Sequence, residues 1–230
     1  VNDDEAGTTV SLIRGVLRGL KDHGYKIGGF NAYATSDVLV GAGLSSSAAF
    51  EVVVGTIISG LYNDMKINSV EIAQISQYAE NVFFKKPCGL MDQMACSVGG
   101  MVNIDFKDPT KPIVKKVPTE FEKYDYSLCI VDTKGDHVDL TDDYAMIPSE
   151  MKKVANFLGE DYLRDCDSNE FYIRLDEIRE AVGDRPVLRA IHFFNEEYNV
   201  KNAVSSLENG KFVEFLDAIR KSGNSSFKYL

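Results

Sequence analysis

The sequence has 230 residues, of which 44% are hydrophobic, so it is long enough to bury the core of one large domain or two small ones. Its 35 acidic and 25 basic residues give a net charge of −10, which argues against a broad binding surface for nucleic acid or anionic membranes. Four cysteines without a C-x-x-C pair, and the lack of an apolar run of about 18 residues, favour a protein of the reducing cytoplasm without a membrane span.

The first elements expected along the chain are a helix, a strand and a second helix. Apolar residues at helical spacing predict an amphipathic helix over residues 8–23, ended by Gly24. Alternation of larger and smaller residues predicts a strand over 29–35. The almost entirely apolar segment 45–62 predicts a helix buried at the centre of its domain. The turn between them therefore leads from a strand into a buried helix.

That turn has the composition of a phosphate-binding loop. Small residues allow backbone N–H groups to approach a phosphate, and serine hydroxyls follow at the start of the helix, where the unpaired amides and the dipole favour negative charge. No G-K-[ST] sequence follows, so the loop is not a Walker motif. Taken alone, the serines fit a plain helix cap at least as well. The loop consists of Gly41, Ala42, Gly43, Leu44, Ser45, Ser46 and Ser47.

Two acidic residues lie in the helices expected next. A capping-box sequence opens a helix over 68–84, which carries Glu80 late in its length. A break then precedes a helix over 90–97 with Asp92 in its first turn, where the helix dipole favours a carboxylate. Alternating residues on both sides of a turn predict a β-hairpin over 101–117.

We place a domain boundary near residue 118, which predicts domains 1–118 and 119–230. The second domain opens with an apolar segment, 126–131, that predicts a buried strand. Beyond Pro148 the pattern is helical, and glycines mark several helix ends. The helices are expected over 149–158, 169–182, 187–207 and 211–221, the last ended by Gly223.

Three features in combination resemble the galactokinases, which are GHMP small-molecule kinases. They are the Gly/Ser loop with its following alanine at 41–48, Glu80, and Pro-Cys-Gly-Leu-Met-Asp-Gln at 87–93. The third is similar to the galactokinase segment around the catalytic aspartate and is the most specific. The resemblance extends from about residue 9 to 230. It implies an α+β fold of two lobes, an N-terminal lobe in 1–118 and a mostly helical C-terminal lobe in 119–230.

The resemblance also implies a role for individual residues. Asp92 would face the sugar hydroxyl as a catalytic residue, Ser47 and Glu80 would bind Mg²⁺, and Gly89 and Tyr144 would contact the sugar. These residue types suit the chemistry, because phosphoryl transfer needs positioning, charge neutralisation and an acceptor for the hydroxyl proton, and Mg²⁺ prefers oxygen ligands. In isolation each has an ordinary structural explanation, such as a carboxylate at a helix start or a solvated helix residue.

The implied activity is ATP-dependent phosphorylation of a monosaccharide at its anomeric hydroxyl, with galactose as the expected substrate. The family's N-terminal sugar signature and its C-terminal Gly-rich motif do not appear in the sequence, so we expect both lobes to be incomplete. Two alternatives stay open. The first alternative to the enzyme is a catalytically inactive sensor that binds sugar or nucleotide, and the second is a core fragment without activity of its own. The presence of Asp92 favours the enzyme.

Overall fold

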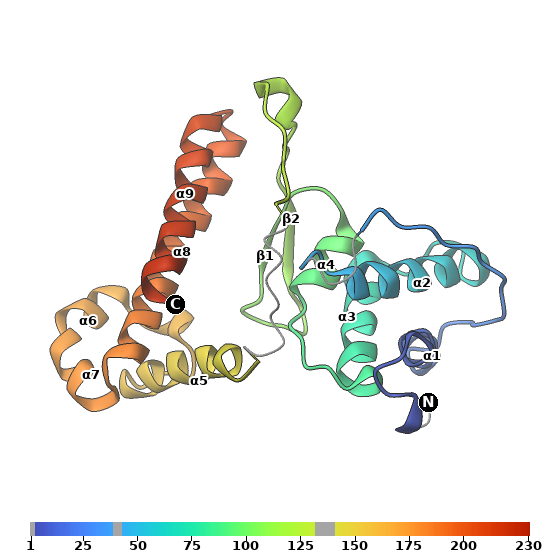
Figure 1. Ribbon diagram of the computed structural model, residues 1–230, viewed down its shortest axis with the longest axis horizontal. Helices are drawn as coiled ribbons and strands as arrows, with labels where there is room; N and C mark the ends of the chain where they lie inside the picture. Colours follow the sequence, from blue (N-terminus) through green and yellow to red (C-terminus); the bar gives the residue numbers. More distant parts are fainter. Residues whose placement is uncertain (1–2, 39–42, 132–140) are drawn as a thin grey trace. The chain divides into compact units, whose positions relative to one another are not determined.

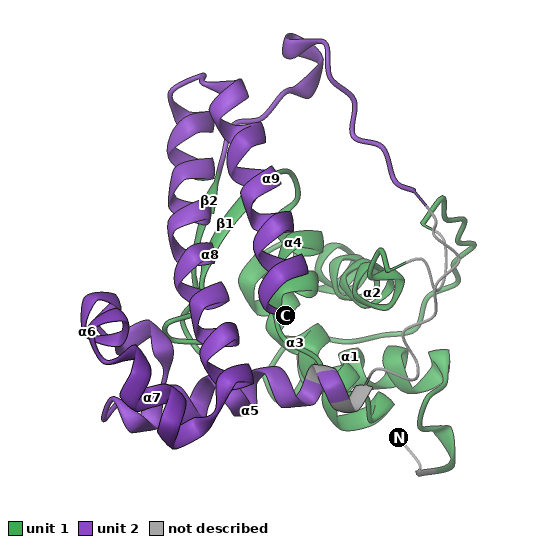
Figure 2. Cartoon of the chain, turned by 60° about the vertical axis from the view of Figure 1, so that its left-hand side comes forward, with its two compact units in different colours: residues 1–116 green, residues 117–230 purple. Residues whose placement is uncertain are grey.

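The structure is a computed structural model that describes residues 3–38, 43–131 and 141–230. The chain divides into two compact units, residues 1–116 and 117–230, shown in green and purple in Figure 2. Helices dominate the described residues, and the strands form a two-stranded sheet. The expected α+β class is confirmed. None of the helices in the described part of the chain is both long and apolar enough to cross a membrane.

The first unit consists of short helices around a small hydrophobic core, with a β-hairpin after the last of them (Figure 1). The segment labelled η2 is a π-helix that continues α3 without a break. In chain order the elements are η1 (Asp3–Glu5), α1 (Thr9–Asp22), α2 (Ser46–Tyr62), α3 (Ser69–Tyr78), η2 (Ala79–Phe84), α4 (Met91–Val98), β1 (Val102–Asp105) and β2 (Ile113–Lys116).

Helix α1 confirms the amphipathic helix expected at 8–23 and packs closely on α3 and η2. Thr8 caps it by accepting a hydrogen bond from the Ser11 amide. The close approach depends on glycine, because a Cβ added at Gly15 would lie 2.8 Å from Ala79 Cβ, and one at Gly19 would lie 2.8 Å from an Ile75 methyl group. The stripe of α1 that faces these neighbours includes the buried residues Leu12, Val16 and Leu20.

Helix α2 supplies much of the core of this unit but is not buried all round. Ile58 is fully buried, whereas Val53 and Leu61 are 52% and 59% exposed. The expected burial at the centre of the domain therefore holds for one face of α2 only, because the described elements of this unit cover only part of its circumference. The core cluster comprises Val16, Leu20, Val52, Val54, Ile58, Ile67, Ile72, Ile75 and Ala79.

The remaining elements of the first unit agree with their sequence patterns. Asn68 caps α3, because its side-chain oxygen accepts a hydrogen bond from the Glu71 amide at 2.9 Å. Strands β1 and β2 pair antiparallel, with Val102 opposite Lys116, so the expected hairpin is confirmed. Helix α4 packs through Met94 on a smaller core that also receives side chains of the hairpin.

Two expected strands are not formed. Residues 29–35 and 126–131 have no regular secondary structure, and the Tyr33 and Leu128 side chains are 95% and 78% exposed. A strand is stable only when a neighbour accepts and donates its backbone hydrogen bonds. In the described ranges β1 and β2 pair with each other alone, so these segments have a strand-like pattern without a partner strand.

The second unit is helical. Its longest elements, α8 and α9, form an antiparallel pair that lies side by side in both Figure 1 and Figure 2. Phe171 and Ile178 are fully buried in a core that α5, α6, α7 and α8 share. The elements are η3 (Phe121–Tyr124), α5 (Thr141–Phe157), η5 (Leu163–Asp165), α6 (Ser168–Ile173), α7 (Leu175–Val182), α8 (Asp184–Glu208) and α9 (Phe212–Tyr229).

Three helix boundaries in this unit differ from the expected ones. The helix expected at 169–182 is interrupted at Arg174, where ψ is 16°, so that α6 and α7 are separate. Helix α5 begins before Pro148 and contains it. Helix α9 continues through Gly223, because glycine costs only about 1 kcal/mol in a helix interior and packing on α8 outweighs that cost. The assignment of the two units to kinase lobes stays a prediction.

Candidate phosphate and metal site

The candidate site lies in the first unit, where the start of α2 meets η2 and the first turn of α4. Of the expected phosphate loop, Gly41 and Ala42 lie outside the described residues. Gly43 has a φ of +71°, and a Cβ added to it would meet nothing within 4 Å. Glycine is therefore favoured at this position by the left-handed backbone and not by lack of space.

Ser45 precedes α2 but does not cap it. Its φ of 54° is left-handed, and its side chain makes no capping hydrogen bond. Its hydroxyl instead donates to Asp92 Oδ2 at 2.6 Å. The plain-cap explanation is therefore wrong for Ser45, and the first amides of α2 receive no acceptor from this side chain. The structure brings the expected loop and the expected catalytic aspartate together.

Ser47 and Glu80, the two expected metal ligands, are also in contact. Ser47 Oγ donates to Glu80 Oε1 at 2.9 Å, across two separate elements, α2 and η2. Glu80 is only 2% exposed, so it is not a solvated helix residue. Lys86 Nζ lies 3.2 Å from the same Glu80 oxygen. A π-helix such as η2 is rare and occurs frequently at functional sites.

Gln93, the neighbour of Asp92 in α4, connects two buried carboxyl groups. Its side-chain amide donates to Glu80 Oε2 at 2.7 Å and lies 3.4 Å from Glu51 Oε2. Glu51 is fully buried, and burial together with the nearby charge of Glu80 raises its pKa to about 8. Glu51 is therefore protonated at neutral pH. This residue was not among the expected site residues, although it is the only charged residue in α2 and that isolation marks it.

The segment before α4 is fixed by side chains of α3 and η2. The Cys88 carbonyl accepts hydrogen bonds from Gln77 and Asn81, and the Cys88 amide donates to Asn81 Oδ1 at 2.7 Å. Burial and the charge of Glu80 raise the pKa of the Cys88 thiol to about 12, so it is not a nucleophile at neutral pH. Gly89 follows on the surface, and a Cβ added there would meet nothing within 4 Å.

The donor set at Ser47 and Glu80 fits Mg²⁺ only as part of a shared shell. The parts of the chain that the structure describes contain no group of three or more His, Cys, Asp and Glu residues able to hold a metal ion. One carboxylate and one hydroxyl suit Mg²⁺ when phosphate oxygens and waters complete its six ligands, because this ion dehydrates reluctantly and is commonly bound in that way. The residues present therefore fit a nucleotide-bound ion better than a resident one.

Tyr144, the remaining expected contact, belongs to α5 in the second unit, and its side chain lies outside the described residues. Its role stays a prediction. Four of the expected site residues in the first unit form two contacting pairs, Ser45 with Asp92 and Ser47 with Glu80. The other expected residues that the structure describes in this unit, outside these pairs, are Gly43, Leu44, Ser46 and Gly89. The pairs have different surroundings, since Asp92 is exposed and Glu80 is buried.

Comparison with known proteins identifies relatives along most of the chain. Residues 11–100 match the family model of the GHMP kinases N terminal domain. A galactokinase of Streptomyces coelicolor is 32% identical over 219 residues, which are 93% of this chain and 54% of that protein. A galactokinase of Limosilactobacillus reuteri is 30% identical over 226 residues, 96% of this chain and 56% of that protein. The chain therefore spans about half the length of these relatives.

A solved structure shows the same fold. The crystal structure of Lactococcus lactis galactokinase complexed with galactose matches with a TM-score of 0.74 and 22% identity, over 97% of this chain and 57% of that one. The sequence matches, the matched domain and the shared fold point to the same group of proteins. Residues 11–100 therefore carry a GHMP kinase N-terminal domain, and the relatives that the chain matches along most of its own length are galactokinases.

Proposed function

We propose that this site serves ATP-dependent phosphorylation of a monosaccharide at its anomeric hydroxyl, with galactose as the substrate, in the complete protein to which these residues belong. The observation that carries the proposal is the arrangement at the start of α2, where two serines of one loop contact two carboxylates with different surroundings. An exposed carboxylate and a buried one suit different tasks.

Asp92 is the acceptor of the proton from the sugar hydroxyl, or the group that orients this hydroxyl. It is exposed, so a substrate can reach it, and the Ser45 hydroxyl holds one of its oxygens. A carboxylate at this place can accept the proton of the sugar hydroxyl and can orient this hydroxyl toward the phosphorus atom. In phosphoryl transfer the larger contribution comes from such positioning.

The loop before α2 holds the nucleotide phosphates. The left-handed backbone at Gly43 and Ser45 turns the chain into the helix, and the first amides of α2 and the helix dipole favour an anion there. Ser47 and Glu80 would hold Mg²⁺, which supplies neutralisation of phosphate charge when bound. The Gln93 amide fixes the second Glu80 oxygen.

The named relatives support galactose as the first sugar to test, since they are galactokinases and the matching crystal structure holds galactose. Gly89 contacts the sugar in this proposal, because it follows the fixed Cys88 segment and lies only three residues before Asp92. Tyr144 contributes a further sugar contact.

A sugar screen tests the proposal. The complete protein is incubated with ATP, Mg²⁺ and single monosaccharides, ADP release is followed by a coupled assay, and the product is identified by ³¹P NMR. We expect galactose to give the fastest release and a phosphate on the anomeric oxygen. Nucleotide binding without sugar-dependent ADP release for any monosaccharide would contradict the proposal and favour a sensor instead.

A further inference from the structure

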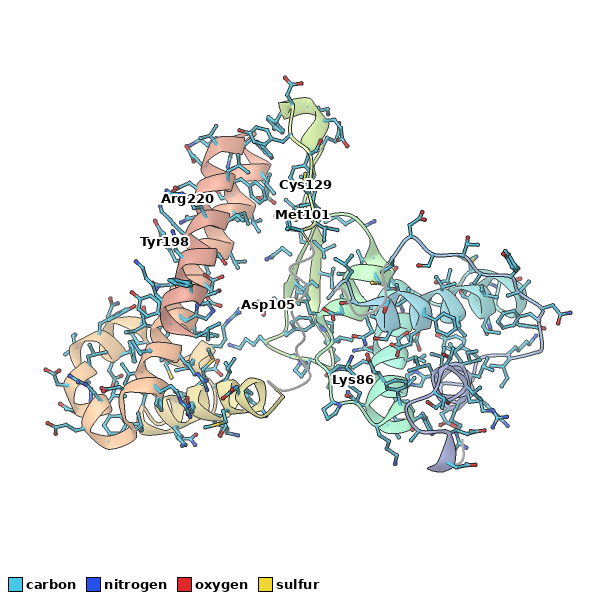
Figure 3. The ribbon with its side chains drawn as sticks, in the orientation of Figure 1. Lys86, Met101, Asp105, Cys129, Tyr198 and Arg220 are labelled. Carbon is cyan, nitrogen blue, oxygen red and sulfur yellow. The ribbon has the colours of Figure 1, made fainter. Side chains whose placement is uncertain are left out.

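Lys86 forms an ion pair with Glu80, one of the two expected metal ligands. Its ammonium lies 3.2 Å from Glu80 Oε1, the oxygen that also accepts the Ser47 hydroxyl. Lys86 lies in the segment between η2 and α4, where Figure 3 labels it. Its side chain is 61% exposed, whereas that of Glu80 is 2% exposed. The lysine therefore reaches a buried carboxylate from an exposed stem.

The contact has a clear electrostatic purpose in the metal-free protein. A buried carboxylate is costly unless a positive charge or several hydrogen bonds compensate it. Ser47 and Gln93 donate hydrogen bonds to Glu80, but both are neutral, and Lys86 adds the opposite charge. An ammonium on a flexible four-carbon stem can do this and still move into water when another cation arrives.

We propose that Lys86 competes with the divalent cation for Glu80, neutralising this carboxylate in the metal-free protein and leaving Glu80 Oε1 when the metal binds. The inference rests on the proposed function, because it takes Glu80 and Ser47 as metal ligands. Its physical basis is that two cations on one carboxylate oxygen repel each other strongly at a separation of a few ångströms. Lys86 thereby lowers the affinity of the site for metal.

Competition with the metal and direct binding of phosphate are two different roles for Lys86, and they predict different effects when its charge is removed. Removal of the Lys86 charge strengthens the contribution of the metal to nucleotide binding, and it destabilises the metal-free protein, since Glu80 loses its counter-ion. A lysine that binds phosphate would instead weaken nucleotide binding when removed, with and without metal. The two roles therefore predict opposite changes in affinity for the metal–nucleotide complex.

The experiment compares Lys86→Met with the wild type in the complete protein. Binding of a non-hydrolysable ATP analogue is measured by calorimetry with Mn²⁺ and again with EDTA, and the ratio of the two affinities gives the contribution of the metal. We expect Lys86→Met to raise this ratio at least about fivefold, within the usual range of coupling between two ligands. Melting in EDTA shows whether the variant folds and whether it is less stable.

Two controls separate charge at Glu80 from other effects. Lys86→Arg keeps the charge and should stay close to the wild type, so it also reports on the site if the methionine variant fails to fold. Lys66→Met removes an exposed lysine that pairs with exposed Asp64 and should leave the ratio unchanged. An unchanged or lower ratio in Lys86→Met would overturn the competition. A wild-type ratio of one would overturn both the metal site and the competition, so the two failures are distinguishable.

Discussion

Ser45 Oγ donates a hydrogen bond of 2.6 Å to Asp92 Oδ2, and this bond joins the residue before α2 to the first turn of α4. The last part of the phosphate loop therefore also orients the carboxylate that meets the sugar hydroxyl in our proposal. In that proposal the nucleotide and sugar subsites share the Ser45 hydroxyl group, so a change at Ser45 should affect turnover more than the binding of either substrate.

Ser45→Ala should lower kcat about tenfold while KM for the sugar changes little. The reason is that the variant loses the hydrogen bond that orients Asp92, whereas the contacts that bind the sugar are kept. Steady-state kinetics of the complete protein measure this. Ser46→Ala is the matched control, since it removes a hydroxyl from the same turn without removing the bond to Asp92. Equal losses in the two variants would show that the bond to Asp92 has no role in turnover.

Gly43→Val should weaken ATP binding more than sugar binding. The left-handed φ of +71° disfavours a β-branched residue, so the variant must distort the loop that holds the phosphates in our proposal. Gly29→Val is the control, because a Cβ at Gly29 also meets nothing within 4 Å and its φ is not left-handed. Calorimetry with each ligand decides the matter, and equal loss of both affinities in Gly43→Val would leave the loop without a phosphate role.

Glu51 should make the protein less stable as the pH rises. Its pKa is about 8 in the folded protein, against 4.5 as the ordinary value, so between these values the folded state retains a proton that the unfolded state has lost. Its contribution to stability is complete below pH 4.5 and disappears as the pH rises through 8. The slope is at most about 1.4 kcal/mol for each pH unit.

Glu51→Gln keeps the shape of the neutral carboxyl group and cannot ionise, so it should remove this slope. Urea unfolding of the variant and the wild type at pH 5 and pH 8 measures the difference. We expect the variant to gain stability relative to the wild type at the higher pH. Parallel pH dependences of the two proteins would show that folding does not raise the pKa of Glu51.

Local patterns predicted most of the helices and the hairpin correctly. Helix α1 and the Asn68 cap of α3 depend on residues within a few positions of one another, and such patterns can be read from sequence. The expected strands at 29–35 and 126–131 depended on partner strands, which a local pattern cannot supply. The same alternation was sufficient at 101–117 because both strands of the hairpin are contiguous.

The site residues also divide into those that local sequence motifs predict and those that depend on contacts between separate elements. Asp92 and Glu80 were predicted because they lie in or near recognisable motifs, and the structure brings each into contact with a serine of the loop. Glu51 and Lys86 were not predicted, because their importance comes from burial and from contacts between separate elements. An acidic residue alone in an apolar helix was the one available indication for Glu51, whereas the sequence around Lys86 contained none.

The second unit offers a test of buried charge that is independent of the site. Arg189 Nη1 lies 2.7 Å from Glu150 Oε2, and both side chains are about 5% exposed or less. Glu150→Gln should destabilise the protein by about 3 kcal/mol or more, because it leaves a buried guanidinium without its counter-charge. Asp217→Asn, at an exposed ion pair with Lys221, should have a much smaller effect in the same urea titration. Equal effects would contradict this account.

Our central claim is that Asp92 acts on the sugar hydroxyl while the loop before α2 binds the nucleotide. The most direct measurement is therefore turnover and ATP affinity of Asp92→Asn in the complete protein, since asparagine still accepts the Ser45 hydrogen bond but is a far weaker proton acceptor. We predict that kcat falls roughly 10²-fold or more while the dissociation constant for ATP stays nearly unchanged. Turnover at the wild-type rate in this variant would contradict the role of Asp92 in the reaction.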